Sequence, residues 1–217
     1  MNKKTDKREL HKNKPARKDH WEQVYLNKKS TEVSWYQQHP ERSLELIEAT
    51  GIAKSARIID IGGGASTLVD FLLDAGYKSL SVLDISQQAI KQAKCRLGKM
   101  ANKVEWLEQD ITLFTADKPF SLWHDRAVFH FLTDADDRAS YVQVMSAALK
   151  PGAHVIIAAF DVNGPKKCSG LEVMHYSPEK MSAVLGDSFQ LIDTSTENHV
   201  TPGGSSQSFV YCRFIRV

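Results

Sequence analysis

Cysteine is scarce in this sequence. Cys95, Cys168 and Cys212 are the three present, and no two of them have the CxxC spacing of a metal-binding pair. An odd, scattered set argues against a disulfide framework and against structural zinc. We therefore predict no metal site, and we expect a reducing, cytoplasmic location.

Long hydrophobic runs are also missing. One of the longest, residues 155–160, falls far short of the roughly 18 to 20 residues that a membrane-spanning helix needs. The N-terminal residues lack the apolar core of a secretory signal. Neither a membrane-spanning nor a secreted chain is expected from this pattern.

Neither positive nor negative charge is in large excess overall, but the positive charges are concentrated near the N-terminus. The net charge of the 217 residues is +2. Residues 1–18 hold eight Lys or Arg against Asp6 and Glu9, so this segment carries +6 and the remainder −4. We predict a flexible basic tail over 1–18, followed by one domain over 19–217. The alternative for the tail is an electrostatic handle for RNA or an acidic partner.

Apolar strands and amphipathic helices alternate through the domain. Ser66, Ser86, Thr133 and Ser177 are predicted to cap helices, and Gly76 and Gly186 to end them. The expected strands are 57–61, 79–83, 103–107, 120–123, 153–160, 189–196 and 207–217. This order predicts an α/β fold with a doubly wound, mostly parallel sheet, in which the closing pair of strands supplies one antiparallel strand near the C-terminus.

A glycine-rich turn follows the first predicted strand, in Asp60-Ile61-Gly62-Gly63-Gly64. Glycines at this place let a ligand approach the backbone, and the next helix offers it an N-terminus. Asp84 ends the following strand, where a carboxylate can accept hydrogen bonds from both ribose hydroxyls of an adenosine. The alternative for Asp84 is an exposed turn aspartate.

Asp110-Ile111 repeats this arrangement after the third strand, where it is placed to read the adenine amino group and cover the ring; a turn or cap aspartate is the alternative. A dinucleotide-binding fold would share the first two features. Asp60 favours S-adenosylmethionine (SAM) instead, because its carboxylate suits the amino group of a methionine moiety and repels a pyrophosphate. Thr67 also stands where the dinucleotide pattern places glycine.

These motifs resemble those of class I SAM-dependent methyltransferases. Residues 19–216 are more narrowly similar to the group that includes the citrate synthase lysine methyltransferase. The residues that carry the similarity are His20-Trp21-x-x-x-Tyr25, Ser34-Trp35-Tyr36, the string from Trp123 to Leu132, Cys168-Ser169-Gly170-Leu171 and His199-x-Thr201-Pro202, with Ser66 departing from the third glycine of the general motif.

The resemblance implies a Rossmann-like sheet of seven strands in the order 3-2-1-4-5-7-6. It also implies that Trp21, Tyr25 and Trp35 close over SAM, where aromatic rings can stack or attract a cation. The alternative is that these rings fasten the N-terminal segment to the sheet. The predicted cofactor-binding set is Trp21, Tyr25, Trp35, Asp60, Gly62, Gly64, Asp84, Ile85, Asp110 and Ile111.

Polar residues at the end of the fourth strand are the catalytic candidates. Asp125 is placed to hold an incoming ammonium or to contact the methionine end of the cofactor, and His124 or His130 to accept a proton near neutral pH. The alternatives are an ion pair between Asp125 and Arg126, and a core position for His130. His199 is expected at the rim of the acceptor site, and Cys168 is expected to pack rather than react.

The sequence therefore predicts an enzyme that moves a methyl group from SAM to a nucleophile, with S-adenosylhomocysteine (SAH) as the product form of the cofactor. The resemblance favours a protein lysine as acceptor, while a small molecule or RNA stays open. A nicotinamide-dependent oxidoreductase and a non-catalytic SAM-fold binding protein are the rivals from other classes.

Overall fold

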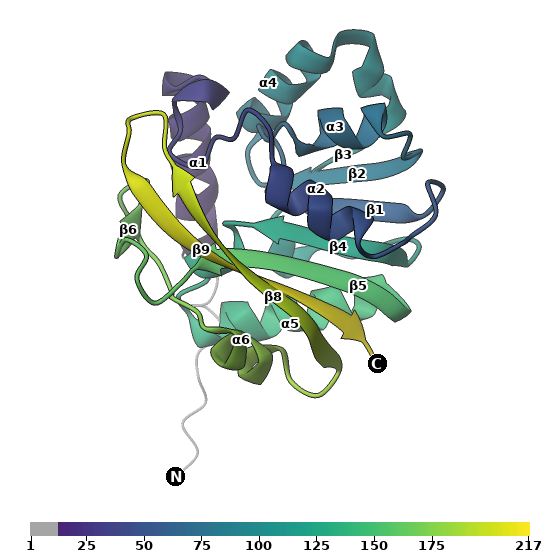
Figure 1. Ribbon diagram of the computed structural model, residues 1–217. Helices are drawn as coiled ribbons and strands as arrows, with labels where there is room; N and C mark the ends of the chain where they lie inside the picture. The colour runs from purple at the N-terminus through teal and green to yellow at the C-terminus, as the bar shows by residue number, and fades with distance from the viewer. Residues whose placement is uncertain (1–12) are drawn as a thin grey trace.

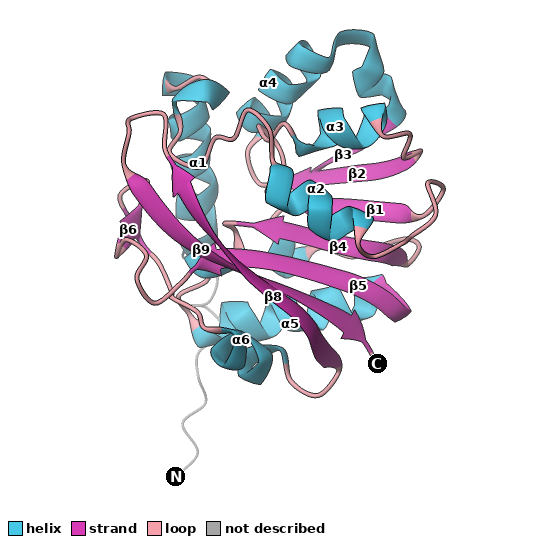
Figure 2. Ribbon diagram, viewed as in Figure 1, coloured by secondary structure: helices cyan, strands magenta, loops and turns pink. Residues whose placement is uncertain are grey.

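The computed structural model describes residues 13–217, arranged as a central sheet with helices on both faces (Figures 1 and 2). The helices are α1 (Asn13–Asn27), α2 (Glu41–Glu48), α3 (Leu68–Asp74), α4 (Gln87–Leu97), α5 (Ala135–Ala148) and α6 (Pro178–Leu185). The strands are β1 (Arg57–Ile61), β2 (Ser79–Asp84), β3 (Val104–Glu108), β4 (Phe120–Arg126), β5 (Leu149–Phe160), β6 (Lys167–Cys168), β7 (Leu171–Glu172), β8 (Phe189–Val200) and β9 (Ser206–Arg216).

Seven of the strands form one sheet in the order β3-β2-β1-β4-β5-β9-β8. The pairs from β3 to β5 are parallel, whereas β9 runs antiparallel to both β5 and β8. With β6 and β7 in a separate short hairpin, this is the predicted doubly wound arrangement, and the prediction of one antiparallel strand near the C-terminus is confirmed.

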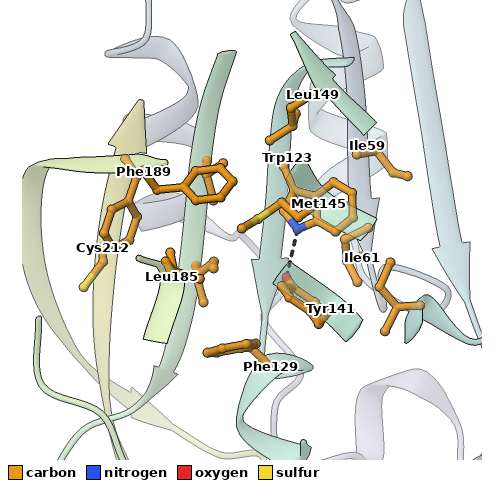
Figure 3. Close-up of a cluster of buried hydrophobic side chains, with 14 of the residues drawn as sticks. Ile59, Ile61, Trp123, Phe129, Tyr141, Met145, Leu149, Leu185, Phe189 and Cys212 are labelled. Atoms are coloured by element: carbon orange, nitrogen blue, oxygen red, sulfur yellow. Dashed lines mark hydrogen bonds between the residues drawn. The ribbon is translucent and has the colours of Figure 1, made fainter. Parts of the chain in front are cut away.

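Neighbouring residues of β1 show how the sheet is buried on both faces. Ile58 packs in a cluster with α2 and α3, and Ile59 packs in a second cluster with α5 and α6. In the second cluster Trp123 donates a hydrogen bond to the hydroxyl of Tyr141 at 2.8 Å (Figure 3). Strands covered on both faces read as continuous apolar runs, which is why 153–160 was recognisable in the sequence.

Two predicted helix caps shift by one residue. α5 is capped by Asp134, whose carboxylate accepts from the N–H groups of Asp136 and Asp137, and not by Thr133. At α3 the cap position is Thr67, although the hydroxyl of Ser66 accepts from Leu68 N at 3.1 Å. Both shifts leave the helix starts within a residue or two of the prediction, since Ser, Thr and Asp compete for the same role.

The first helix changes the expected domain boundary. α1 begins at Asn13, so residues 13–18 of the predicted tail are helical, while the prediction for residues 1–12 lies outside the described residues. Figure 1 shows α1 beside the carboxyl ends of the parallel strands. Within residues 13–217, no helix combines the length and hydrophobicity needed to cross a membrane.

Candidate functional site

A crevice opens at the carboxyl ends of β1 to β4 and is covered by α1. Most of the predicted cofactor-binding residues line it: Trp21, Tyr25, Trp35, Gly62, Asp84, Ile85, Asp110 and Ile111. Gly64 lies behind this surface, and Asp60 lines a second hollow that shares Gly62, Trp35 and Arg126 with the first. The two hollows are neighbours that share these lining residues, with Asp84 and Asp110 lining the first and Asp60 and His124 lining the second.

The turn after β1 has no room for side chains, as Gly62 and Gly64 illustrate. Gly62 has a φ of +68°, and a Cβ there would lie 2.1 Å from Cγ2 of Val128. A Cβ on Gly64 would lie 2.6 Å from Oδ2 of Asp84. The turn is therefore kept free of side chains because the ends of β2 and β4 pack directly against its backbone.

Asp84 is buried at the end of β2 and faces the crevice. Its Oδ2 accepts a hydrogen bond from Gly64 N at 3.0 Å, and its Oδ1 accepts one from Ser86 N at 2.8 Å. Burial raises the pKa of Asp84 to about 6, although both N–H groups favour the charged form. Each carboxylate oxygen keeps a further lone pair for a ligand hydroxyl.

Asp110 stands after β3 and caps the short 3-10 helix η3 (Ile111–Leu113). Its Oδ1 accepts from Thr112 N at 2.9 Å and from Thr112 Oγ1 at 2.8 Å. Oδ2 faces the guanidinium of Arg17, with 3.5 Å between Oδ2 and Nη1. This carboxylate is thus both the predicted cap and a side chain at the crevice.

The aromatic residues of the N-terminal segment pack edge to face over the crevice. The ring centroid of Trp21 lies 5.6 Å from that of Trp35 and 4.9 Å from that of Phe131. Trp35 Nε1 donates to the hydroxyl of Tyr25 at 3.2 Å, and burial raises the pKa of that tyrosine. The same rings fasten α1 to the body and line the hollow, as the fastening interpretation expected, and their closure over SAM stays a prediction.

Asp60 and His124 form a buried pair on the neighbouring strands β1 and β4. Asp60 Oδ1 lies 2.7 Å from His124 Nδ1, and His124 Nε2 lies 2.9 Å from the hydroxyl of Ser43 on α2. The other oxygen of Asp60, Oδ2, is buried with no hydrogen-bond partner among the described residues. A buried carboxylate oxygen without a partner is costly, so it fits a ligand that brings a donor.

Asp125 is fully buried and holds the turn that follows β4. Its Oδ1 accepts from Val128 N at 2.9 Å, and its Oδ2 accepts from the hydroxyl of Tyr141 at 2.6 Å. Within this turn Ala127 has a φ of +72°, a strained value for a residue with a Cβ. Burial raises the pKa of Asp125 to about 6. Asp125 fixes backbone that lines the crevice but does not line the crevice itself.

His130 occupies the core position that was its alternative interpretation. Its ring is fully buried, with ring centroids of Phe131 and Phe160 at 4.5 and 4.6 Å, and Nδ1 accepts from Phe160 N at 3.3 Å. Burial lowers the pKa of His130 to about 3, with a further contribution from the charge of Arg126. Like Asp125, it does not line the crevice.

Two arginines at the site were not predicted as site residues. Arg126 lines both hollows. It donates hydrogen bonds to the hydroxyl of Tyr211 at 2.8 Å and to Trp35 O at 3.0 Å. Its ion-pair partner is Glu197 and not Asp125. Arg17 lines the first hollow. The spacing of Arg17, Trp21 and Tyr25, four residues apart each time, places them on one helix face and was available in the sequence.

Comparisons with known proteins agree with this geometry. Residues 59–155 match a family profile described as a methyltransferase domain. The eEF1A lysine and N-terminal methyltransferases of Mus musculus and Bos taurus are 32% and 27% identical to this chain over 123 and 122 residues, which is 55% of this chain in each case. The matched segment is 17% of the length of either relative.

Solved structures share the fold across most of the chain. The N-methyltransferase NodS from Bradyrhizobium japonicum WM9, in complex with SAH, superposes with a TM-score of 0.69 at 19% identity, covering 91% of this chain and 99% of that one. The glycopeptide N-methyltransferase MtfA, also complexed with SAH, gives 0.65 at 16% identity, covering 85% and 92%. Together with the methyltransferase-domain match and the confirmed strand order, they show that the chain has the fold of the class I SAM-dependent methyltransferases.

Proposed function

We propose that this protein is a SAM-dependent methyltransferase that modifies an amine of a protein, with a lysine side chain as the acceptor. The relatives that match 55% of the chain are named for lysine and N-terminal methylation of eEF1A, which supports a protein acceptor. The matched segment is 17% of their length, so this support concerns only the segment that is shared.

The observation that carries the cofactor assignment is the row of three acidic side chains at the carboxyl ends of the adjacent strands β1, β2 and β3. We assign Asp84 to the ribose hydroxyls, Asp110 to the adenine amino group and the unpaired Oδ2 of Asp60 to the amino group of the methionine moiety. Ile85 and Ile111 supply apolar contacts to the adenosine. SAM, when bound, supplies a methyl group already activated by the positive sulfur.

We assign His124 and Asp125 positioning roles at the other end of the site. His124 orients Asp60 through the 2.7 Å contact, and Asp125 holds the Ala127 turn in its strained form. Such fixed backbone aligns the reacting groups without taking part in proton transfer. His130 contributes packing beneath this end, because its ring is enclosed and held neutral.

An open groove beside Arg126 is our candidate entrance for the acceptor. It is lined by Tyr36, Gln37, Glu197 and His199, and it shares Tyr36 and Gln37 with the hollow near Asp60. His199 Nε2 lies 2.7 Å from Ser34 O, which ties β8 to the N-terminal segment at this rim. A wide surface groove that leads to a narrower site suits a side chain presented by a macromolecule better than it suits a small free amine.

We also propose a cytoplasmic location. All three cysteines are free, with Cys95 exposed and Cys168 and Cys212 buried. Free thiols persist most readily in a reducing compartment. Growth of cells carrying a fluorescent fusion, with imaging of its compartment, tests this directly.

The function is tested by incubating the purified protein and a hypomethylated cell extract with SAM labelled in its methyl group. We expect label in protein, removed by protease and resistant to nuclease, with methyl-lysine found by mass spectrometry. The Asp84→Ala variant abolishes it, whereas Asp117→Ala, which changes an exposed carboxylate away from the crevice, keeps it. Label only in RNA or in small molecules would reject the lysine acceptor.

A further inference from the structure

We propose that Arg17 closes the adenine end of the crevice and contacts the adenosine part of the bound cofactor. This inference rests on the proposed assignment of Asp84 and Asp110 to the adenosine. It gives a binding role to a residue that lies in the basic segment expected to be a tail.

The helix face that carries Arg17 is the one that meets the crevice. Arg17, Trp21 and Tyr25 are spaced four residues apart, so they lie above one another on α1, and all three line the hollow. Trp21 and Tyr25 contribute rings toward Trp35, and Arg17 extends the same face beyond them to Asp110. One face of one helix therefore covers the site from the β4 side to the β3 side.

Two carboxylates from different elements converge on the guanidinium. Arg17 Nη1 lies 3.5 Å from Oδ2 of Asp110, after β3, and Nη2 pairs with Oδ2 of Asp137, in the first turn of α5. The three side chains are 19%, 10% and 13% exposed, respectively, so water screens them only in part. Without Arg17, two like charges would face each other at the edge of the hollow.

The chemistry of a guanidinium suits this position. It is planar and permanently charged, so it can lie against a purine ring while it donates hydrogen bonds in its own plane to carboxylates. By holding Oδ2 of Asp110 at the crevice, Arg17 also orients the oxygen that we assign to the adenine amino group. A lysine would give a point charge without the flat surface.

The rest of α1 has anchors that do not involve Arg17. Glu22 accepts hydrogen bonds from Gln87 N at 2.6 Å and Gln88 N at 3.2 Å, at the positive N-terminus of α4. Lys18 pairs with Glu108 at 2.5 Å, but its side chain is 45% exposed and does not line the hollow. An Arg17 variant should therefore keep α1 in place, and Lys18 provides a matched control one residue away.

The experiment is calorimetric titration of the full chain and of its Arg17→Ala and Lys18→Ala variants with SAH and with 5′-methylthioadenosine, which lacks the amino-acid part. We expect Arg17→Ala to weaken both ligands by the same factor, roughly tenfold, the size of one charge-assisted contact. Lys18→Ala should stay within about twofold of the parent, as exposed ion pairs usually do. Thermal melting of the ligand-free proteins checks that each variant is folded.

Three results overturn the proposal. Unchanged affinities in Arg17→Ala would make Arg17 a surface ion pair only. Equal losses in both variants would show that docking of α1, and not Arg17 itself, is what matters. A loss for SAH but not for methylthioadenosine would move the effect away from the adenine end. A folded parent that binds neither ligand would instead reject the proposed function, which keeps the two failures distinct.

Discussion

The two ends of the crevice use the same kinds of residue in opposite ways. Near β2 and β3, Asp84 and Asp110 bring carboxylate oxygens to the crevice surface. Near β4, Asp125 and His130 are fully buried, and they support backbone and rings that form the surface. A polar residue at the carboxyl end of a parallel strand is thus either a ligand group or a support. The distinction depends on whether its hydrogen-bonding atoms are already satisfied by other protein groups or remain able to bind a ligand.

The largest effect is expected from removing a support. Asp125→Ala should lower the free energy of unfolding by about 3 kcal/mol, because Val128 N, Phe129 N and the hydroxyl of Tyr141 lose their buried acceptor. Urea denaturation measures this loss. Asp125→Asn keeps an acceptor oxygen for the two N–H groups and should recover most of the stability and the methyl transfer. A stable Asn variant without transfer would show that the charge acts in the reaction.

Removing a ligand group should affect binding more than stability. Asp84→Ala is expected to weaken SAH by more than about 100-fold, since two hydroxyl contacts to a charged acceptor are lost. Calorimetry measures the affinity, with Asp117→Ala as a carboxylate deletion outside the crevice. If the two variants bind SAH equally well, Asp84 belongs with the supports.

Lowering the pH should weaken the binding of SAH through its adenosine part. Because burial raises the pKa of Asp84 to about 6, this carboxyl takes up a proton as the pH falls through 6 and can no longer accept from two hydroxyls at once. We expect SAH affinity to be highest above pH 6 and to fall about tenfold by pH 5. Titrations from pH 5 to 8 give the profile. Asp84→Asn should bind weakly at every pH, and a profile that persists in this variant would assign the proton to another group.

The smallest effect is expected at His130. Its pKa, lowered to about 3, keeps the ring neutral from pH 5 to 9, and the ring lies outside the crevice. The pH profile of methyl transfer by His130→Gln should keep the shape of the parent profile. The rate should fall by less than the roughly 100-fold that loss of a general base costs. Disappearance of one limb of the profile would restore His130 as a proton acceptor.

The order of the sheet was predictable because buried parallel strands are apolar and end in glycines or aspartates. Asp84 and Asp110 were predictable for the same reason, since Asp84 is the last residue of β2 and Asp110 comes shortly after the end of β3 at Glu108. β4 was expected to stop at Trp123, because the polar residues that follow resemble the end of a strand. In the structure β4 continues to Arg126, since it pairs with β1 on one side and with β5 on the other. Whether a polar side chain such as that of Asp125 faces inward depends on partners on other elements. Tyr141 of α5, which hydrogen-bonds to both Trp123 and Asp125, is one such partner.

Arg17 and Lys18 were assigned to a tail because a run of charge without apolar spacing favours disorder. Their partners, Glu108, Asp110 and Asp137, lie far along the chain, so local pattern contained no sign of the pairing. The aromatic spacing from Trp21 to Tyr25 was the available signal. It indicates a helix face, and continuing that face backward by one turn reaches Arg17.

The contact between Arg17 and Asp137 spans 120 residues of chain. α1 therefore leaves the ribosome long before α5, its most distant partner at this contact, has been synthesised. Forming so long a loop is slow, so docking of α1 belongs among the late steps of folding. A ligand that fills the crevice and touches α1 would favour this last step by mass action.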